Sequence, residues 1–140
     1  MRLLFTSFTN MNINIKTKDL ELTDAIESYL AKKLESLGKF MKSFNQEAII
    51  ADVELGKTTR DQRAGDIFRA EINLEIGGEL LRAEAETESI YASIDEVRDQ
   101  IEEEIKKFKE KKEALFKRGA RSIKKMLNLS PMARFRRPEE

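Results

Sequence analysis

A lysine-rich heptapeptide, KKFKEKK, is a part of this sequence whose side chains are suited to binding an anion. It spans residues 106–112 and holds five lysines in seven residues. Ammonium groups at this density can bind phosphate groups. The same pattern also suits the solvated end of a helix, because lysines are favoured near a helix C-terminus. Glutamates stand four residues before the first two lysines, so ordinary helical ion pairs explain part of the cluster equally well.

The C-terminal segment continues this positive charge. Residues 113–140 contain eight basic and three acidic residues, a net charge of +5, whereas residues 1–112 contain 18 basic and 23 acidic residues, a net charge of −5. Arginine forks bind phosphates and also stack on bases. A mildly acidic body with a basic arm indicates an anionic partner, which we expect to be bound in a salt-dependent manner with weak sequence specificity.

Catalytic chemistry has few candidates in this chain. It contains no histidine and no cysteine, which excludes the Ser-His and Cys-His nucleophiles and removes the commonest metal ligand. Neither a Walker-type phosphate loop nor a dinucleotide fingerprint occurs. No apolar run approaches the roughly 20 residues that span a membrane. We therefore expect no enzyme, no cofactor, no metal site, no small-molecule substrate and no membrane partner.

The spacing of apolar residues predicts the elements that position these charges. Period-two alternation predicts four half-buried strands, at residues 11–17, 47–55, 67–76 and 80–87. The glycine pair Gly77-Gly78 predicts a hairpin between the last two strands. Residues 22–38 are predicted to form a helix with Thr23 as its N-cap and Gly38 at its end. Residues 56–66 are predicted to form a loop.

The last predicted element is a long helix that starts near Ser89. Its predicted core-facing residues recur at helical spacing over about five turns and are Ile90, Ile94, Val97, Ile101, Ile105 and Phe108. We expect the helix to run to about Phe116, to be interrupted at Gly119, and to be followed by a short amphipathic helix over RSIKKMLNL. The terminal PMARFRRPEE has little to bury and is predicted to be partly disordered when free.

These elements predict an α+β fold. The order β-α-β-β-β-α gives a four-stranded sheet with two helices packed on one face. Residues 11–112 are predicted to form this domain, and residues 113–140 a basic tail. Residues 1–10 are either a flexible leader or a mis-assigned start, because Met11 follows them.

Several motifs resemble a known family. Ile90-Tyr91-Ala92-Ser93-Ile94-Asp95 is similar to the family's helix opening D-[MV]-Y-A-A-I-D, and Lys106-Lys107-Phe108-Lys109 to its closing K-Y-K. Upstream, INIKTKDLELTDAIESYLAKKLESLGKF resembles the family's first strand and helix, and IFRAEINLEIGGELLRAEAE its third and fourth strands. The family is that of the ribosome hibernation promoting factors, also called ribosome-associated inhibitors or sigma-54 modulation proteins. The resemblance covers about residues 12–112 and is to the short form of the family, since the tail is too short for the second, dimerising domain of the long form.

The resemblance implies a function and a partner. Members of this family bind the small ribosomal subunit in the cleft for messenger and transfer RNA, block translation and protect idle ribosomes under stress. They are not enzymes, and their domain is similar in shape to double-stranded RNA-binding domains, with basic residues of both helices on ribosomal RNA. The resemblance therefore implies a cytoplasmic, ribosome-associated protein. We expect it to be a monomer off the ribosome.

The chain departs from the family at three positions. Glu27 stands in the first turn of the first helix, and Gln100 and Glu103 stand midway along the last, where members carry basic residues. We hypothesise that the arginines of the basic tail bind RNA in place of the two positions midway along the last helix, Gln100 and Glu103. The candidate rRNA-binding residues are Lys32, Lys33, Arg69, Arg82, Lys106, Lys107, Lys109, Lys112, Arg118, Arg121, Lys124 and Lys125.

Two other functions stay open. The long helix and RSIKKMLNL have the pattern of a protein-interaction module that docks on a partner protein through Ile123, Met126 and Leu127. A general double-stranded RNA binder is less favoured. Such domains have a basic start to their last helix, and this chain has Glu88-Ser89-Ile90 there.

Overall fold

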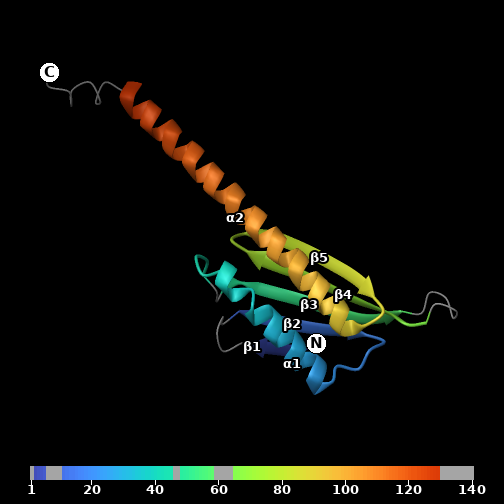
Figure 1. Ribbon diagram of the computed structural model, residues 1–140. Coiled ribbons are helices and arrows are strands. Elements are labelled where there is room, and N and C mark those ends of the chain that lie inside the picture. Colours follow the sequence, from blue (N-terminus) through green and yellow to red (C-terminus); the bar gives the residue numbers. More distant parts are fainter. Residues whose placement is uncertain (1, 6–10, 46–47, 59–64, 130–140) are drawn as a thin grey trace. The chain divides into compact units, whose positions relative to one another are not determined.

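The computed structural model describes residues 2–5, 11–45, 48–58 and 65–129 (Figure 1). Its elements in chain order are β1 (Arg2–Phe5), β2 (Asn12–Lys18), α1 (Asp24–Glu35), a 3-10 turn η1 (Gly38–Phe40), β3 (Ile50–Thr58), β4 (Ile67–Ile76), β5 (Glu79–Thr87) and α2 (Ile90–Leu129). The chain divides into two compact units, residues 1–106 and residues 107–140. The helix α2 contributes to both units.

The five strands form one mixed sheet in the order β1-β2-β3-β4-β5. β2 and β3 are parallel neighbours joined through α1, and every other neighbouring pair is antiparallel. The β4–β5 hairpin turns at Gly77 and Gly78, whose φ angles are 58° and 80°. Two consecutive residues with positive φ are the requirement of a type I′ turn, which explains the glycine pair.

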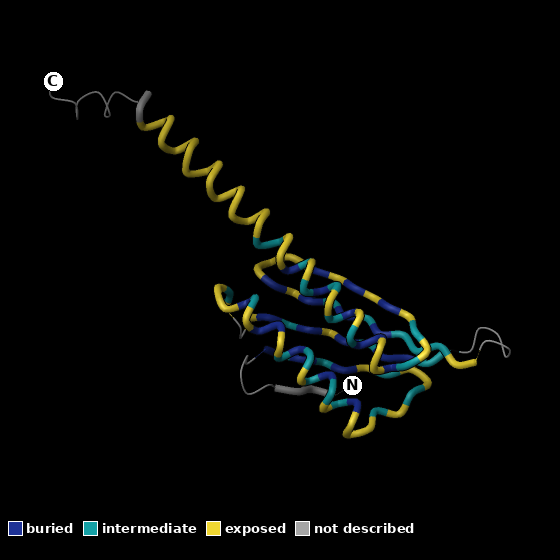
Figure 2. The backbone as a smooth tube through the Cα atoms, in the orientation of Figure 1, coloured by how far each residue is buried: buried dark blue, intermediate teal, exposed yellow. Residues whose placement is uncertain are grey.

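The core lies between one face of the sheet and the two helices (Figures 1 and 2). Side chains alternate between buried and accessible along β2 to β5, as a sheet covered on one face requires. The helices contribute Ile26, Leu30 and Leu34 from α1 and Ile90, Ile94, Val97, Ile101 and Ile105 from α2. Within residues 1–106, α2 is therefore part of the core.

A buried hydroxyl group joins the start of α2 to the sheet. Ser93 is fully buried, and its hydroxyl donates to the Phe68 carbonyl at 2.7 Å and lies 2.8 Å from Thr87 Oγ1. Thr87 Oγ1 also accepts a hydrogen bond from the Ser89 amide at 3.2 Å. Each buried polar atom of this group thus has a partner, which removes the penalty of burying it.

The first turn of α1 depends on a side-chain cap. Thr23 is extended, and its Oγ1 accepts a hydrogen bond from the Ile26 amide at 3.2 Å. Replacing Thr23 by Ala is expected to lower the free energy of unfolding by about 1 kcal/mol, because the amide loses its acceptor. Urea unfolding followed by circular dichroism measures this, and Thr23→Ser serves as the matched control. Equal stability of the Ala variant and the wild type would contradict the role of the cap.

The α+β fold predicted from the sequence is confirmed, with two corrections. The four predicted strands are β2 to β5, and Arg2–Phe5 adds β1 at the edge of the sheet, which makes five strands. The break predicted at Gly119 is wrong, because α2 continues without interruption to Leu129. One glycine in a helix costs about 1 kcal/mol relative to alanine, and the strong helix formers around it outweigh that. The predicted disorder of residues 131–140 lies outside the described residues.

Candidate nucleic-acid interface

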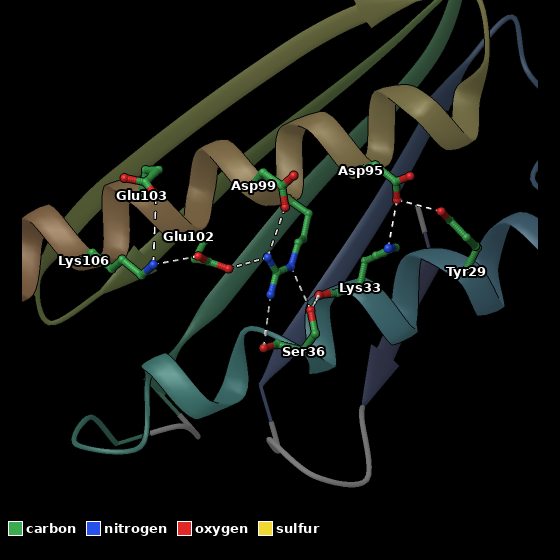
Figure 3. Close-up of polar contacts among 9 residues, drawn as sticks. Tyr29, Lys33, Ser36, Asp95, Asp99, Glu102, Glu103 and Lys106 are labelled. Atoms are coloured by element: carbon green, nitrogen blue, oxygen red, sulfur yellow. Dashed lines mark hydrogen bonds and ion pairs between the residues drawn. The ribbon is translucent and has the colours of Figure 1, made fainter.

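An aromatic and ionic cluster joins α1 to the first part of α2 (Figure 3). Tyr29 donates to Asp95 Oδ1 at 2.6 Å, and Lys33 Nζ lies 3.1 Å from the same oxygen. The Tyr29 ring also meets the Tyr91 ring edge-on, with the centroids 5.0 Å apart, and Lys33 Nζ lies 5.3 Å from the Tyr29 centroid. These contacts fix the position of Lys33, one of the predicted phosphate-binding residues, and pair its ammonium group with the Asp95 carboxylate.

The same contacts shift the pKa values of Tyr29, Lys33 and Asp95. The hydrogen bond from Tyr29, reinforced by Lys33, holds the pKa of Asp95 below its ordinary value. The hydrogen bond to Asp95 raises the pKa of Tyr29, and the contact with Asp95 raises the pKa of Lys33. At neutral pH Asp95 is therefore a carboxylate with two donors.

Asp95→Asn is expected to make the protein less sensitive to acid. The lowered folded pKa of Asp95 contributes stability above the unfolded value near 3.9, and this stability is lost as pH falls through the folded value. Since the side chain is 45% exposed, solvent screening keeps the contribution below about 1 kcal/mol. Urea unfolding from about pH 6 to pH 2 should show wild type and variant converging at low pH. A stability difference that stays constant over this range would contradict the assignment; Glu96→Gln controls for the change in net charge.

Arg98 is a basic residue that the sequence analysis missed. Its Nε donates to Ser36 Oγ at 2.8 Å, and its Nη1 donates to Asp99 at 3.1 Å and to Glu102 (Figure 3). Only 14% of the side chain is exposed. Arg98 therefore ties the N-terminal part of α2 to Ser36, the C-cap of α1. Its i, i+4 spacing to Glu102 is the one sequence signal from which a structural role could have been predicted.

Lys106 lies about one turn beyond Glu102 on α2. Its Nζ is 2.8 Å from Glu102 Oε2 and 5.2 Å from the centroid of the Phe40 ring. Lys39 Nζ lies 5.1 Å from the same ring centroid. The hydrogen bond with Glu102 raises the pKa of Lys106 and lowers that of Glu102. The ion pair expected from the sequence between Glu102 and Lys106 is thus present, and two cations gather on one half-buried aromatic ring.

The outer face of the sheet holds two more predicted residues, Arg69 and Arg82. Arg69 contacts three carboxylates, with distances of 2.5 Å to Glu71, 2.5 Å to Glu84 and 3.8 Å to Glu54. Arg82 lies 3.1 Å from Glu71 and 3.5 Å from Glu84. Hydrogen bonding to Glu71 raises the pKa of Arg69. Because the helices cover the opposite face, the structure does not bring Arg69 and Arg82 together with Lys32, Lys33 and Lys106.

The second unit carries the remaining predicted residues. Lys107, Lys112, Arg118, Arg121, Lys124 and Lys125 are exposed along α2, and Lys109 is half-buried. Residues 110–127 are exposed without a break (Figure 2). Lys112 Nζ lies 6.0 Å from the centroid of the half-buried Phe108 ring. Phe108 was predicted to belong to the core stripe, and it is not among the buried side chains.

Positive charge is concentrated in the exposed part of α2. Residues 107–127 hold nine basic and two acidic residues, a net charge of +7. No helix among the described residues is long and apolar enough to cross a membrane. In the same residues no cluster of three or more His, Cys, Asp or Glu side chains could hold a metal ion. What the geometry offers is a line of accessible cations suited to phosphate groups.

Fold and charge together define an α+β protein with the element order β-β-α-β-β-β-α, whose last helix is strongly cationic from residue 107 to residue 127. A sequence profile of the family described as sigma 54 modulation protein / S30EA ribosomal protein matches residues 13–113. This chain belongs to that family.

Relatives and solved structures agree with this assignment. The chain is 34% identical over 101 residues to the ribosome hibernation promotion factor of Picosynechococcus sp., covering 72% of this chain and 50% of the relative. It is 31% identical over 101 residues to the ribosome hibernation promoting factor of Klebsiella oxytoca, covering 72% and 96%. The chain thus spans about half the length of some curated relatives and nearly all of others. These names describe ribosome factors, and neither is that of an enzyme.

Two solved structures share the fold. The N-terminal domain of protein Y from Thermus thermophilus superposes with a TM-score of 0.59 at 34% identity, covering 70% of this chain and 99% of that one. A ribosomal subunit interface protein from Coxiella burnetii superposes with a TM-score of 0.55 at 16% identity, covering 69% and 96%. The second likeness supports the fold alone.

Proposed function

We propose that this protein is a ribosome-associated hibernation factor of the cytoplasm. It binds the small ribosomal subunit in the channel for messenger and transfer RNA, blocks translation and stabilises idle ribosomes. Membership of the family and the names of its relatives support the ribosome as partner. It acts as a monomer and by occupying a site, with no reaction of its own.

The distribution of charge is the observation that carries this proposal. Residues 1–106 hold 14 basic and 22 acidic residues, a net charge of −8, and residues 107–140 hold 12 basic and 4 acidic residues, a net charge of +8. Phosphate contacts supply most of the sequence-independent affinity for nucleic acid. The cationic C-terminal part therefore provides the electrostatic attraction to ribosomal RNA, and the folded domain provides shape and orientation.

The predicted binding residues do not contribute equally in this proposal. Lys32 is exposed at the end of α1, while Lys33 and Lys106 reach phosphates from positions already held by carboxylates. Arg69 and Arg82 would have to leave their glutamates to bind RNA. We therefore assign the main phosphate contacts to Lys32 and to the lysines and arginines from position 106 onward, and a minor share to Lys33, Arg69 and Arg82.

Competition with the natural occupants of the channel tests this proposal. Small subunits are first loaded with messenger and transfer RNA, and binding of the labelled protein is then compared with binding to empty subunits. The proposal predicts strong binding to empty subunits and little to loaded ones, together with inhibition of translation in a cell-free extract. Equal binding to empty and loaded subunits would place the site outside the channel.

The alternative function, a protein-interaction module, has one observation in its favour. The side chains of Ile123, Met126 and Leu127 are 61%, 69% and 54% exposed on α2. Large apolar side chains exposed in series mark a surface that contacts another molecule. Ribosome binding does not exclude such a contact, because ribosomes contain protein as well as RNA.

A further inference from the structure

The part of α2 in the second unit exposes an apolar stripe that phosphate binding does not use. Five large apolar side chains between positions 115 and 127 are each 54–77% exposed, namely Leu115, Phe116, Ile123, Met126 and Leu127. They lie at the one-, three- and seven-residue spacings of one helix face. We call these five residues the apolar stripe.

The cations between positions 117 and 125 lie on the opposite face. Lys117, Arg118, Arg121, Lys124 and Lys125 are all exposed, and we call these five residues the basic face. At 3.6 residues per turn, the centre of the basic face lies about 180° around the helix from the centre of the apolar stripe. A partner that satisfies both faces must offer negative charge on one side of the helix and apolar surface on the other.

Charge argues against a second copy of this chain as the partner. A pair of these helices would bring two segments of net charge +7 together, and like charges at close range oppose association. An anionic lipid surface could bury the apolar stripe, but an interfacial helix lies with its apolar side toward the acyl chains. The cations would then be attracted to the headgroups only from the water side of the helix, without the direct contacts that RNA phosphates can make with the basic face.

Naked RNA is also an incomplete partner. It offers phosphates to the basic face, yet nothing for the apolar stripe, which would stay in water. Burial of a Leu, Ile or Phe side chain is favourable, so a partner with apolar surface beside its RNA binds more tightly than RNA alone. A ribosome has this composition, since it presents protein next to RNA.

We propose that residues 115–127 lie between ribosomal RNA and a ribosomal protein, with the apolar stripe docked in an apolar groove of that protein and the basic face on RNA phosphates. This inference rests on the proposed function and adds a protein contact to it. It also explains why the segment keeps apolar side chains among so many lysines and arginines.

Two matched double variants of the full chain test the inference. Phe116→Gln with Ile123→Gln removes the centre of the apolar stripe, and Arg121→Gln with Lys124→Gln removes two charges from the basic face. Glutamine is a good helix former, and circular dichroism checks that helix content is kept. Affinity is measured for intact small subunits and for protein-free ribosomal RNA, each over a range of salt concentrations.

The stripe variant should bind intact subunits about tenfold more weakly or worse, because it lacks two apolar anchors. Its affinity for protein-free RNA and its salt dependence should equal those of the wild type. The basic-face variant should bind both more weakly, with a salt slope reduced by about 1 to 2.

Other outcomes overturn the inference. If the stripe variant binds intact subunits with the affinity of the wild type, the apolar stripe makes no protein contact there. If its affinity falls equally for intact subunits and for free RNA, the stripe acts through RNA. Binding of wild type to phosphatidylglycerol vesicles, lost in the stripe variant while subunit affinity is unchanged, assigns the stripe to lipid. Self-association of wild type that the stripe variant loses assigns it to a second copy. If wild type binds no subunits at all, the proposed function itself has failed.

Discussion

Replacing Lys106, Lys107, Lys109 and Lys112 together by Gln is expected to weaken binding to small ribosomal subunits by about a hundredfold at 0.1 M salt. Each lysine replaced removes one phosphate contact and one released counterion. The slope of log affinity against log salt should become shallower by about 3, since each contact contributes roughly 0.7 to 0.9. Filter binding or sedimentation with purified subunits measures both quantities.

Arg69 and Arg82 supply the control for this experiment. Replacing both by Gln also removes positive charge, but from the outer face of the sheet, where each arginine contacts at least two carboxylates. Affinity should fall much less per charge than in the lysine variant. An equal loss per charge would show that net charge alone determines binding, and it would contradict the assignment of the contacts to the last helix.

Replacing Ile101 by Ala is expected to lower the free energy of unfolding by about 2–5 kcal/mol, because it leaves a cavity between α2 and the sheet. Ile101 is 0% exposed. For a domain of this size, the melting temperature should fall by roughly 10 °C or more. Thermal unfolding followed by circular dichroism gives the value, and Ile101→Val should cost only about 0.5–1.5 kcal/mol.

Ile123→Ala is the matched control in the same helix. Ile123 is 61% exposed, so its replacement should change stability by no more than about 0.5 kcal/mol. If both alanine variants were equally destabilised, Ile123 would belong to a core, and the apolar stripe would have no role in docking. Together the two variants separate the part of α2 that holds the fold from the part that is available to a partner.

Local signals in the sequence predicted much of the fold. The positive φ angles of Gly77 and Gly78 and the cap at Thr23 follow from the chemistry of those residue types. The parallel pairing of β2 with β3 was not predicted, because it depends on the path of the chain through α1. β1 was missed because Arg2–Phe5 is short and shows no alternation.

The candidate site was predicted only in part, because local patterns are visible in the sequence and contacts between distant residues are not. The cations from Lys106 onward are visible as a run in the sequence, and most of them are exposed in the structure. The partners of Arg69 depend on the register of three strands, which brings Glu54, Glu71 and Glu84 to it from separate positions. Arg98 was missed because its contact with Ser36 is 62 residues away in sequence.

The most direct test of the account is the affinity of the full chain for purified small ribosomal subunits, measured from roughly 50 to 400 mM salt. We predict tight binding at low salt and a log–log slope of about −4 to −6, as expected for most of the cations between positions 106 and 125 acting on phosphates. Absence of binding at every salt concentration, or binding that does not change with salt, would contradict the account.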